Sequence, residues 1–415
     1  MATRLLLGVV LALISTAHSF SDEEEAENKR QQEYAKNTTK TLDRLKSSMD
    51  KRLRPFFGGK PVVVYVDIYI VNIGEISVTN MDYKLMLYYR QTWHDPRLAF
   101  DLPEAITVQG GMLNDIWIPD TLFTNEKSST FHKVTQDNYL LSIWPNGTTY
   151  LSMRISLTGI CPMDLRKYPM DTQTCYLNIM SYSGSTDNLI LKWKFGETGS
   201  VTWAENINLP QMDVLGVKGR EVVDVFASGN FSRLSLAFKF KRRISLFLTE
   251  TYVPLVLIVA LSWVSFWINY KVAPARVALC ITTVLTIITL SASVRTSLPK
   301  VTYTKYSDWI LITGLVYVFG ALVEYAVVNY FDNAQAKKNV AKAVDVENAK
   351  ETEETGDELP KQEKETAVRR ARRMLGLGEV QVETIDIRCR WMVPASFIVL
   401  NLIYWIYFII ESSED

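Results

Sequence analysis

Long apolar runs dominate the second half of the chain and are separated by short polar segments. Four such runs cover about 246–268, 275–298, 309–331 and 391–410. Each is long enough to cross about 30 Å of hydrocarbon as an α-helix. Trp and Tyr residues near the ends of the third and fourth runs suit the two interfaces of a bilayer. The pattern predicts four membrane-spanning helices.

The stretch before these runs, about 61–243, has a different rhythm. Apolar and polar residues alternate in segments such as 62–70, 84–89 and 234–240, as they do in strands with one buried face. Turn-forming residues interrupt the alternation, for example at 145–147 and 183–185. Short strands repeated at this spacing, without helical stretches between them, predict an all-β sandwich.

The first 54 residues predict export and then a charged arm. Residues 1–19 have the form of a signal peptide, with Arg4 before an apolar core and the small residues Ala17 and Ser19 near its end. A retained anchor is the alternative interpretation. Residues 20–54 carry many charges of both signs, which is typical of a solvated helix or a mobile arm. Sequons for N-glycosylation precede the apolar runs, as an exported domain allows, at Asn37, Asn146 and Asn230.

An exported N-terminus and four crossings place the C-terminus outside as well. The long connection before the last run is then cytosolic, and its arginines at 369–373 and 388 agree with the positive-inside rule. Its middle, 347–365, is rich in Glu and Lys and is either disordered or a lone solvated helix. We therefore expect a multi-pass plasma-membrane protein with these parts: signal peptide 1–19, charged arm 20–54, extracellular β-sandwich 55–243, transmembrane helices 244–331, cytosolic loop 332–388, and a last transmembrane helix with an extracellular C-terminus at 389–415.

The second apolar run is unusually rich in hydroxyl side chains. On a helix, steps of three or four place its small and hydroxylated residues on one face, with a single larger apolar residue among them. Such a face can line water, and one apolar residue in a narrow pore can act as a gate by dewetting. A helix–helix interface favours the same residue types and is the alternative. The face consists of Ala278, Thr282, Leu285, Thr289, Ser293 and Thr296.

Charge around this run favours anions as the permeant ions. The whole chain has a formal net charge of zero, which gives no sign of nucleic-acid binding. Between Thr251 and Ser307 there is no Asp or Glu, and Pro274 is suited to the first turn of a helix whose positive dipole end then lies at the cytosolic mouth. Basic rings at pore mouths select anions. The positive-inside rule is the alternative explanation for Lys271 and Arg276, but it does not explain Arg295 and Lys300 on the outer side. The basic residues of this stretch are Lys271, Arg276, Arg295, Lys300 and Lys305.

The cysteines and histidines argue against an enzyme. Cys161 and Cys175 lie in the exported half, where an oxidising compartment favours their pairing, and Cys280 and Cys389 lie in or beside apolar runs. The histidines at 94 and 132 have no neighbouring Cys or paired carboxylates at metal-ligand spacing. No nucleophile motif is present. We expect no catalytic residues, no metal site and no cofactor.

Residues 161–175 resemble the signature loop of the Cys-loop receptors, the pentameric ligand-gated ion channels. Thirteen residues separate the two cysteines, and Pro169 and Asp171 lie between them. Segments 263–269, 274–286, 298–301 and 322–329 resemble the anion-selective glycine and GABA type A branch. The resemblance implies identical or homologous subunits in a pentamer, with Leu285 as the hydrophobic gate. Cation-selective members carry a Glu where this chain has Ala275, after Pro274 and before Arg276.

The resemblance also implies a ligand site between neighbouring extracellular domains. Two positions differ from the glycine and GABA pattern, because Met180 replaces a Glu and Leu122 replaces an aromatic residue. Arg90 matches an arginine that holds the ligand carboxylate in glycine receptors, a task that suits a guanidinium. The alternative role of the aromatic residues is packing. Carried over by position, the site consists of Tyr182, Phe226 and Phe231 on the principal face and Tyr88, Arg90 and Ser152 on the complementary face.

Coupling between the two domains is expected where the β-sandwich meets the membrane. The resemblance places the loop between the cysteines, the end of the last strand and the linker 295–303 there. The charged residues of these segments are Asp164, Asp171, Arg242, Arg295 and Lys300, with structural ion pairing as their alternative role. The resulting hypothesis is a channel subunit whose partners are a small-molecule agonist, the lipid bilayer, further subunits and permeant anions, but not nucleic acid. A non-conducting or auxiliary receptor subunit and a cation-conducting member of the same family are the alternatives.

Overall fold

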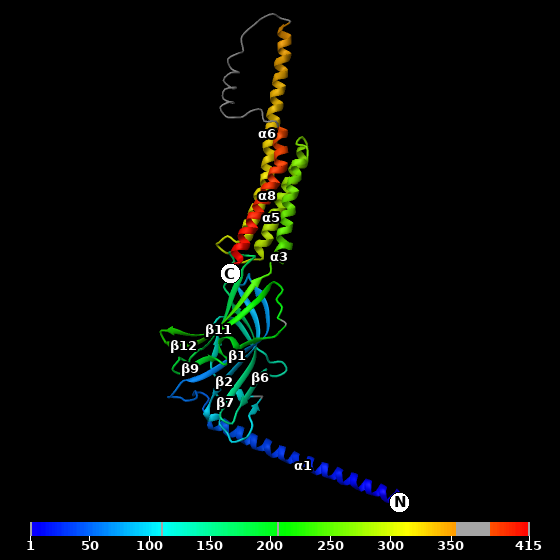
Figure 1. Ribbon diagram of the computed structural model, residues 1–415. Helices are drawn as coiled ribbons and strands as arrows, with labels where there is room; N and C mark the ends of the chain where they lie inside the picture. Colours follow the sequence, from blue (N-terminus) through cyan, green and yellow to red (C-terminus); the bar gives the residue numbers. More distant parts are fainter. Residues whose placement is uncertain (1, 109–110, 206, 354–381, 414–415) are drawn as a thin grey trace.

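The computed structural model of the chain describes residues 2–108, 111–205, 207–353 and 382–413. Figure 1 shows an elongated molecule with a β-domain in the middle, a helical bundle at one end and the N-terminal helix at the other. The predicted combination of a β-sandwich and a four-helix transmembrane bundle is confirmed.

Two sheets form the sandwich. The larger sheet contains β10 (Val201–Trp203), β1 (Val62–Ser77), β2 (Asp82–His94), β7 (Thr148–Ile160), β6 (Tyr139–Ile143) and β3 (Ile106–Val108), with β5 (Glu126–Phe131) beside β7 and β9 (Leu189–Trp193) beside β1. The smaller sheet contains β11 (Met212–Phe226), β12 (Gly229–Arg242), β8 (Thr172–Ser181) and β4 (Thr121–Phe123). Only β9 and β10 run parallel to their neighbour β1 among the described pairs. Short helical turns interrupt the loops at η1 (Pro96–Leu98), η2 (Met112–Asn114) and α2 (Gly196–Gly199).

The core lies between the two sheets and follows the alternation seen in the sequence. On β12, Leu234, Leu236 and Phe238 are fully buried, and they belong to one apolar core with Leu85 and Leu87 of the opposite sheet. Complete burial of one such side chain contributes about 1.5–3 kcal/mol. The predicted turn at 145–147 joins β6 to β7.

The first membrane span is not a uniform α-helix. It consists of α3 (Ser245–Phe247), a π-helical turn η3 (Leu248–Tyr252), α4 (Val253–Trp263) and a 3₁₀ turn η4 (Val264–Trp267). Pro254, in the first turn of α4, has no N–H to donate to the preceding turn. The change of helix type just before it is therefore expected.

The remaining spans are long helices: α5 (Ala273–Thr296), α6 (Tyr306–Glu353) and α8 (Val382–Ser413). They agree with the predicted runs to within a few residues, except that α6 continues to Glu353 and α8 begins at Val382. Both ends of the expected cytosolic loop 332–388 are therefore helical. The arginines at 369–373 lie outside the described residues.

A second apolar core holds the spans together. Leu255 and Val259 of α4, Ile287 of α5 and Val318 of α6 are fully buried within it. Close approach depends on Gly314 of α6, because a Cβ there would lie 2.6 Å from Leu255 Cδ1. A glycine at this position lets three helices meet.

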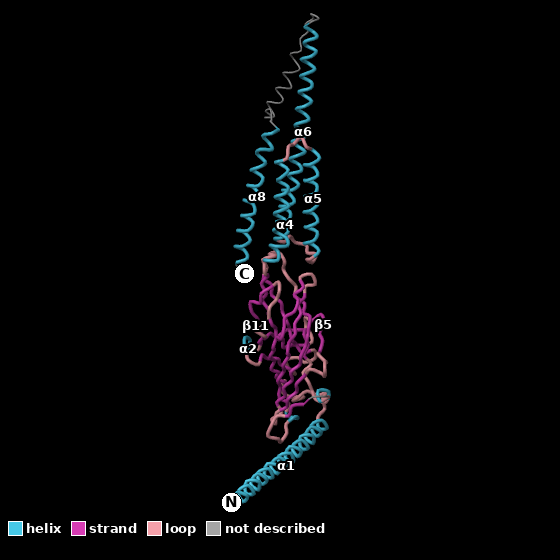
Figure 2. Tube along the Cα trace, turned by 90° about the vertical axis from the view of Figure 1, so that its right-hand side faces the viewer, coloured by secondary structure: helices cyan, strands magenta, loops and turns pink. Residues whose placement is uncertain are grey.

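The N-terminal residues form one helix, α1 (Ala2–Ser48), through both the expected signal peptide and the arm. Figure 2 shows this helix projecting from the β-domain. Among the side chains of this helix that the structure describes, those near its C-terminal end anchor it, since Leu45 is buried and Lys46 pairs with Asp115 at 2.9 Å. The helical alternative for the arm is confirmed, whereas cleavage after residue 19 stays a prediction.

Candidate functional site

The hydroxylated face of α5 is not covered by any other described part of the chain. All of its predicted members are exposed, and Leu285 in its middle is 60% exposed. The opposite face, with Cys280, Thr283 and Ile287, is buried against the neighbouring helices. Packing within this subunit therefore does not explain the small and hydroxylated residues. The two explanations left for this face are the lining of a pore and an interface between subunits.

The hydroxyl groups of this face bond to their own helix. Thr282 Oγ1 donates to the Ala278 carbonyl at 2.9 Å, Thr289 Oγ1 to the Thr286 carbonyl at 2.8 Å and Thr296 Oγ1 to the Ser293 carbonyl at 2.8 Å. The protons of these three hydroxyls are thus satisfied with or without water, and each oxygen can still accept a further hydrogen bond. Such a face tolerates both a wet and a dry state.

Arg276 does not face the same surface, and the expectation of a charged ring at this position is wrong. Its side chain is fully buried, with Nη2 2.7 Å from Asp386 Oδ2 and Nη1 3.1 Å from Asp386 Oδ1. The guanidinium also lies 5.7 Å from the ring centre of Tyr325. Its charge is compensated inside the bundle because a buried cation needs a partner.

Pro274, Ala275 and Ala278 are exposed at the same end of α5, as is Lys271 just before it. Sequence reasoning missed Asp386 and the nearby Glu324, which come from α8 and α6. Both carboxylate oxygens of Glu324 are buried without a hydrogen-bond partner among the described residues. No local pattern connects these acids with Arg276, which is 110 residues before Asp386.

The three principal-face aromatics lie around the end of β8 and the β11–β12 hairpin. Tyr182 is 79% exposed, and Asp120 holds its loop by accepting hydrogen bonds from the backbone N–H groups of Tyr182 (3.1 Å, at its carbonyl) and Ser183 (2.8 Å, at its side chain). Phe226 is half exposed and packs edge-on against Phe231, with ring centres 5.7 Å apart. Phe231 is largely covered, so it supports Phe226 more than it presents its own surface.

The complementary residues lie in the other sheet. Tyr88 and Ser152 line an open groove of about 720 Å³ together with residues 134–140. Arg90, opposite Ser152 across β2 and β7, pairs instead with Asp67 at 3.2 Å and lies over the Tyr69 ring. The two halves of the predicted site therefore sit on different sheets, and one subunit does not bring them together.

The two positions that differ from the amino-acid receptors are direct neighbours. Leu122 of β4 is paired with Met180 of β8, and Met180 is paired with Arg233 of β12. Arg233 in turn binds Asp224 through Nη2 at 3.0 Å. The cross-strand row of Leu122, Met180 and Arg233 thus contains an apolar pair and a cation whose charge Asp224 compensates. It offers no free carboxylate to an ammonium group.

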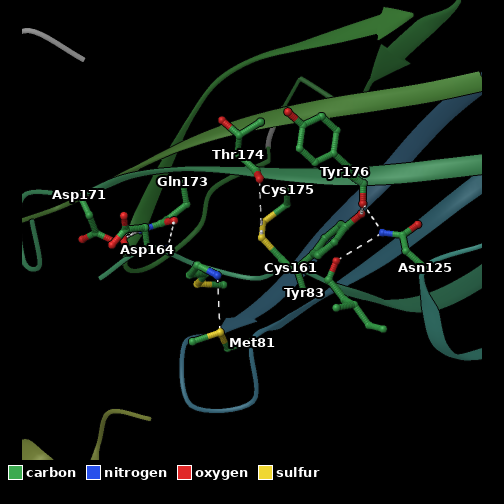
Figure 3. Close-up of a disulfide and its surroundings, with 12 residues drawn as sticks. Met81, Tyr83, Asn125, Cys161, Asp164, Asp171, Gln173, Thr174, Cys175 and Tyr176 are labelled. Carbon is green, nitrogen blue, oxygen red and sulfur yellow. Dashed lines mark hydrogen bonds between the residues drawn. A yellow bond between two sulfur atoms is a disulfide. The ribbon is translucent and has the colours of Figure 1, made fainter. Parts of the chain in front are cut away.

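The disulfide predicted from sequence is formed between Cys161 and Cys175, and Figure 3 shows its surroundings. Gln173 ties the loop together, because its Nε2 donates to Asp171 at 2.7 Å and to the Asp164 carbonyl at 2.6 Å. Tyr83 lies beside the bridge and donates its hydroxyl to the Tyr176 carbonyl at 2.6 Å. Burial raises the pKa of the Tyr83 hydroxyl above its ordinary value. Cys280 and Cys389 carry free thiols.

A buried ion pair connects this loop to the end of the last strand. Arg242 Nε lies 2.7 Å from Asp171 Oδ1, and their side chains are 6% and 1% exposed. The guanidinium also stacks over Tyr168 at 4.8 Å. Burial raises the pKa of the Tyr168 hydroxyl, and the charge of Arg242 partly opposes this. Asp171 and Arg242, both expected at this junction, are therefore in direct contact, while their role in coupling stays a prediction.

The other predicted coupling charges do not meet. Asp164 is exposed and lies 3.8 Å from Arg166, while Arg295 and Lys300 are exposed without an ion pair to any described residue. The domains instead touch through uncharged groups of the loop between the cysteines and of the predicted linker 295–303, and through Thr79, which sequence reasoning missed. The backbone N–H of Leu165 donates to the Tyr303 hydroxyl at 2.9 Å, Thr79 Oγ1 donates to the Ser297 carbonyl at 3.0 Å, and Leu298 packs into the sandwich core.

The three sequons remain available for modification in the folded chain. Asn37 lies on α1, Asn146 in the β6–β7 turn and Asn230 near the tip of the β11–β12 hairpin, and all three are exposed. Asn146 also accepts a hydrogen bond from the Thr148 N–H at 2.9 Å, which stabilises the turn.

Comparison with known proteins covers both domains. Residues 38–244 match the sequence family described as the neurotransmitter-gated ion-channel ligand binding domain, and residues 251–374 match the neurotransmitter-gated ion-channel transmembrane region. The chain is 46% identical over 292 residues to the gamma-aminobutyric acid receptor subunit beta-4 of Gallus gallus. That alignment covers 70% of this chain and 59% of the relative, so the matched part is less than two thirds of the relative's length.

Proposed function

The chain belongs to the family of neurotransmitter-gated ion channels, and we propose that it is one subunit of a pentameric channel in the plasma membrane. A small extracellular ligand opens this channel, and chloride is the main permeant ion. The β-sandwich binds the ligand outside the cell, and α5 of each subunit lines the pore. The family consists of channel receptors and not of enzymes.

The uncovered face of α5 carries this proposal. A membrane helix whose hydroxylated face is exposed in the subunit needs either water or further subunits beside it. Copies arranged around an axis supply both, with Leu285 as the apolar constriction. Its 60% exposure supports this placement.

Anion selectivity rests on charge. No carboxylate occurs between Thr251 and Ser307, and Asp386 is occupied by Arg276. Lys271 is exposed at the inner end of α5, and Arg295 and Lys300 are exposed near its outer end. The relative from Gallus gallus is a receptor subunit for gamma-aminobutyric acid by its name. These features favour anions at both mouths of the pore.

The ligand site forms between the principal face of one subunit and the complementary face of the next. Tyr182 and Phe226 supply aromatic surface, and Arg90 can hold a carboxylate if it leaves Asp67. The Leu122–Met180 pair provides no partner for an ammonium group. We therefore expect weak or absent responses to gamma-aminobutyrate and glycine.

Expression of the chain alone in oocytes tests the function. Candidate small amines, amino acids, carboxylates and protons are applied while current is recorded, and the reversal potential is measured as external chloride is replaced. We expect a ligand-evoked current whose reversal potential follows chloride. A reversal potential that follows sodium contradicts the anion assignment.

A subunit that requires another subunit for activation is the second candidate, and the same Leu122–Met180 pair favours it. The principal face of this subunit would then bind no agonist, and the ligand would bind between other subunits of a mixed pentamer. Absence of current from the chain alone, even with Leu285→Thr, together with current on coexpression with a related subunit, supports this alternative.

A further inference from the structure

A buried ion pair joins the start of α5 to the start of α8, at the end of the bundle that points away from the β-sandwich (Figure 1). The carboxylate of Asp386 accepts two hydrogen bonds from Arg276, and the side chains are 0% and 5% exposed. Arg276 Nε also donates to the Ile268 carbonyl at 2.8 Å. The guanidinium is thus fixed to α8 and to the segment before α5.

Asp386 holds the guanidinium although a second acid is close by. Glu324 of α6 interacts electrostatically with both Arg276 and Asp386. Its carboxylate oxygens are nevertheless buried without a hydrogen-bond partner among the described residues. Tyr325 covers the guanidinium from α6. Cys280 and Cys389, which are free cysteines, also lie near this cluster. The bidentate geometry therefore makes Asp386 the residue that positions Arg276.

Residues of the exposed face of α5 are close neighbours of Arg276 along the helix. Ala275, which directly precedes Arg276, and Ala278, which follows it by two positions, are exposed and small. A guanidinium released from Asp386 has room to turn past them toward water. Movement toward water is then favourable, because burial of a charge without its partner carboxylate costs free energy.

We propose that Asp386 is a positioning residue for the conduction pathway, which rests on the proposed channel function. By keeping the Arg276 guanidinium inside the bundle, Asp386 keeps this charge out of the inner mouth of the pore. A residue of α8 thus sets the electric field that anions meet in a pore lined by α5. The transmembrane arrangement links the two through one ion pair.

The test uses the full chain with Leu285→Thr, which is expected to conduct without ligand, in excised patches with equal chloride on both sides. Asp386→Asn leaves Arg276 without its carboxylate, and the released charges concentrate anions at the inner mouth. Chloride then leaves the cytosolic side more readily. We expect the ratio of inward to outward current to rise by about two-fold or more.

Three further variants separate charge from shape. Asp386→Glu keeps the carboxylate and should keep the parent ratio. The double variant Arg276→Gln with Asp386→Asn has no charge to release and should return to the parent ratio. Glu324→Gln is the matched control, since Arg276 retains Asp386, and should leave the ratio unchanged.

The outcomes are distinguishable. A conducting Asp386→Asn channel with the parent ratio overturns the inference, as does a double variant that keeps the shifted ratio. If Asp386→Asn does not reach the cell surface, return of the double variant to the surface supports the pairing, and its failure to return counts against it. A parent channel without current contradicts the proposed function itself.

Discussion

At the scale of single residues, the chemistry depends on which side chains are covered. Leu285 and Arg276 lie nine residues apart on the same helix, yet one is 60% exposed and the other is fully buried. Leu285 can therefore act on water in a pore, whereas Arg276 can act only through Asp386. The distinction follows from the side of α5 on which each residue lies.

Leu285→Thr is expected to make the closed channel leakier or more sensitive to its ligand. A hydroxyl at the constriction makes wetting easier, so the closed state is less favoured. Current without ligand, recorded from cells that express the variant, measures the effect. Ile312→Thr, the same kind of change on an exposed position of α6, is the control and should behave like the parent. Equal behaviour of the two variants would contradict the gate assignment.

Removal of one partner of the Asp171–Arg242 pair should be strongly destabilising. Both side chains are almost fully buried, and an unpaired buried charge costs about 3–5 kcal/mol. Asp171→Asn and Arg242→Gln should each reduce thermal stability of the solubilised protein, and the double variant should lose less than the sum of the two. Strict additivity would show that the pair contributes little.

Tyr83→Phe should change the response of stability to alkaline pH. The ordinary tyrosine pKa is about 10, and burial raises that of Tyr83 in the folded state. The contribution of the neutral hydroxyl is fully present below the unfolded pKa and is lost as pH rises above it. The variant should therefore be less stable by about 1 kcal/mol at neutral pH, with a smaller difference above pH 10. Thermal melting at both pH values measures this, and a constant difference contradicts it.

At the scale of elements, the transmembrane helices approach closely through one glycine. Gly314 of α6 lies against Leu255 of α4 and Ile287 of α5, whereas a Cβ at Gly320 of the same helix would meet nothing within 4 Å. Two glycines in one helix therefore have different roles. One allows a three-helix contact, and the other faces open space in the isolated subunit.

Gly314→Val should destabilise the bundle. The added side chain must displace Leu255 and Ile287, and overpacking of this kind typically costs about 1–3 kcal/mol. Thermal stability of the solubilised protein provides the measurement. Gly320→Val serves as the matched control in the same helix and should have little effect on the isolated subunit. A larger loss for Gly320→Val would place an interface there instead.

At the scale of the whole molecule, the two domains are joined by contacts that cross between distant segments. The loop closed by Cys161 and Cys175 lies against Tyr303, and Leu298 packs into the sandwich core. A displacement of the β-domain can therefore move the outer end of α5 directly. A switch of this kind shifts an equilibrium between closed and open arrangements.

Tyr303→Phe should loosen this junction without unfolding either domain. The N–H of Leu165 loses its acceptor, so hydrogen exchange in residues 161–175 should become faster. Tyr176→Phe, on an exposed side chain of β8, should leave exchange unchanged. Mass spectrometry of the full chain compares the two, and equal protection would show that the hydroxyl does not hold the loop.

Local patterns were sufficient to predict much of this protein. Hydropathy and alternation predicted the sandwich and the four spans, and helical periodicity predicted the exposed face of α5. The spacing of Cys161 and Cys175, together with export, predicted the disulfide. These features depend on residues close together in the chain, so their physical cause is visible in the sequence.

Only the tertiary structure decided which distant groups meet. Asp386 reaches Arg276 across 110 residues, and Thr79 reaches Ser297 across 218. The pairing of Leu122 with Met180 and Arg233 likewise depends on strand order and register. Periodicity shows which face of an element is buried, but the partner on the other side depends on how all the elements pack. For this reason Arg276 looked like a pore charge in the sequence and is a buried ion-pair member in the fold.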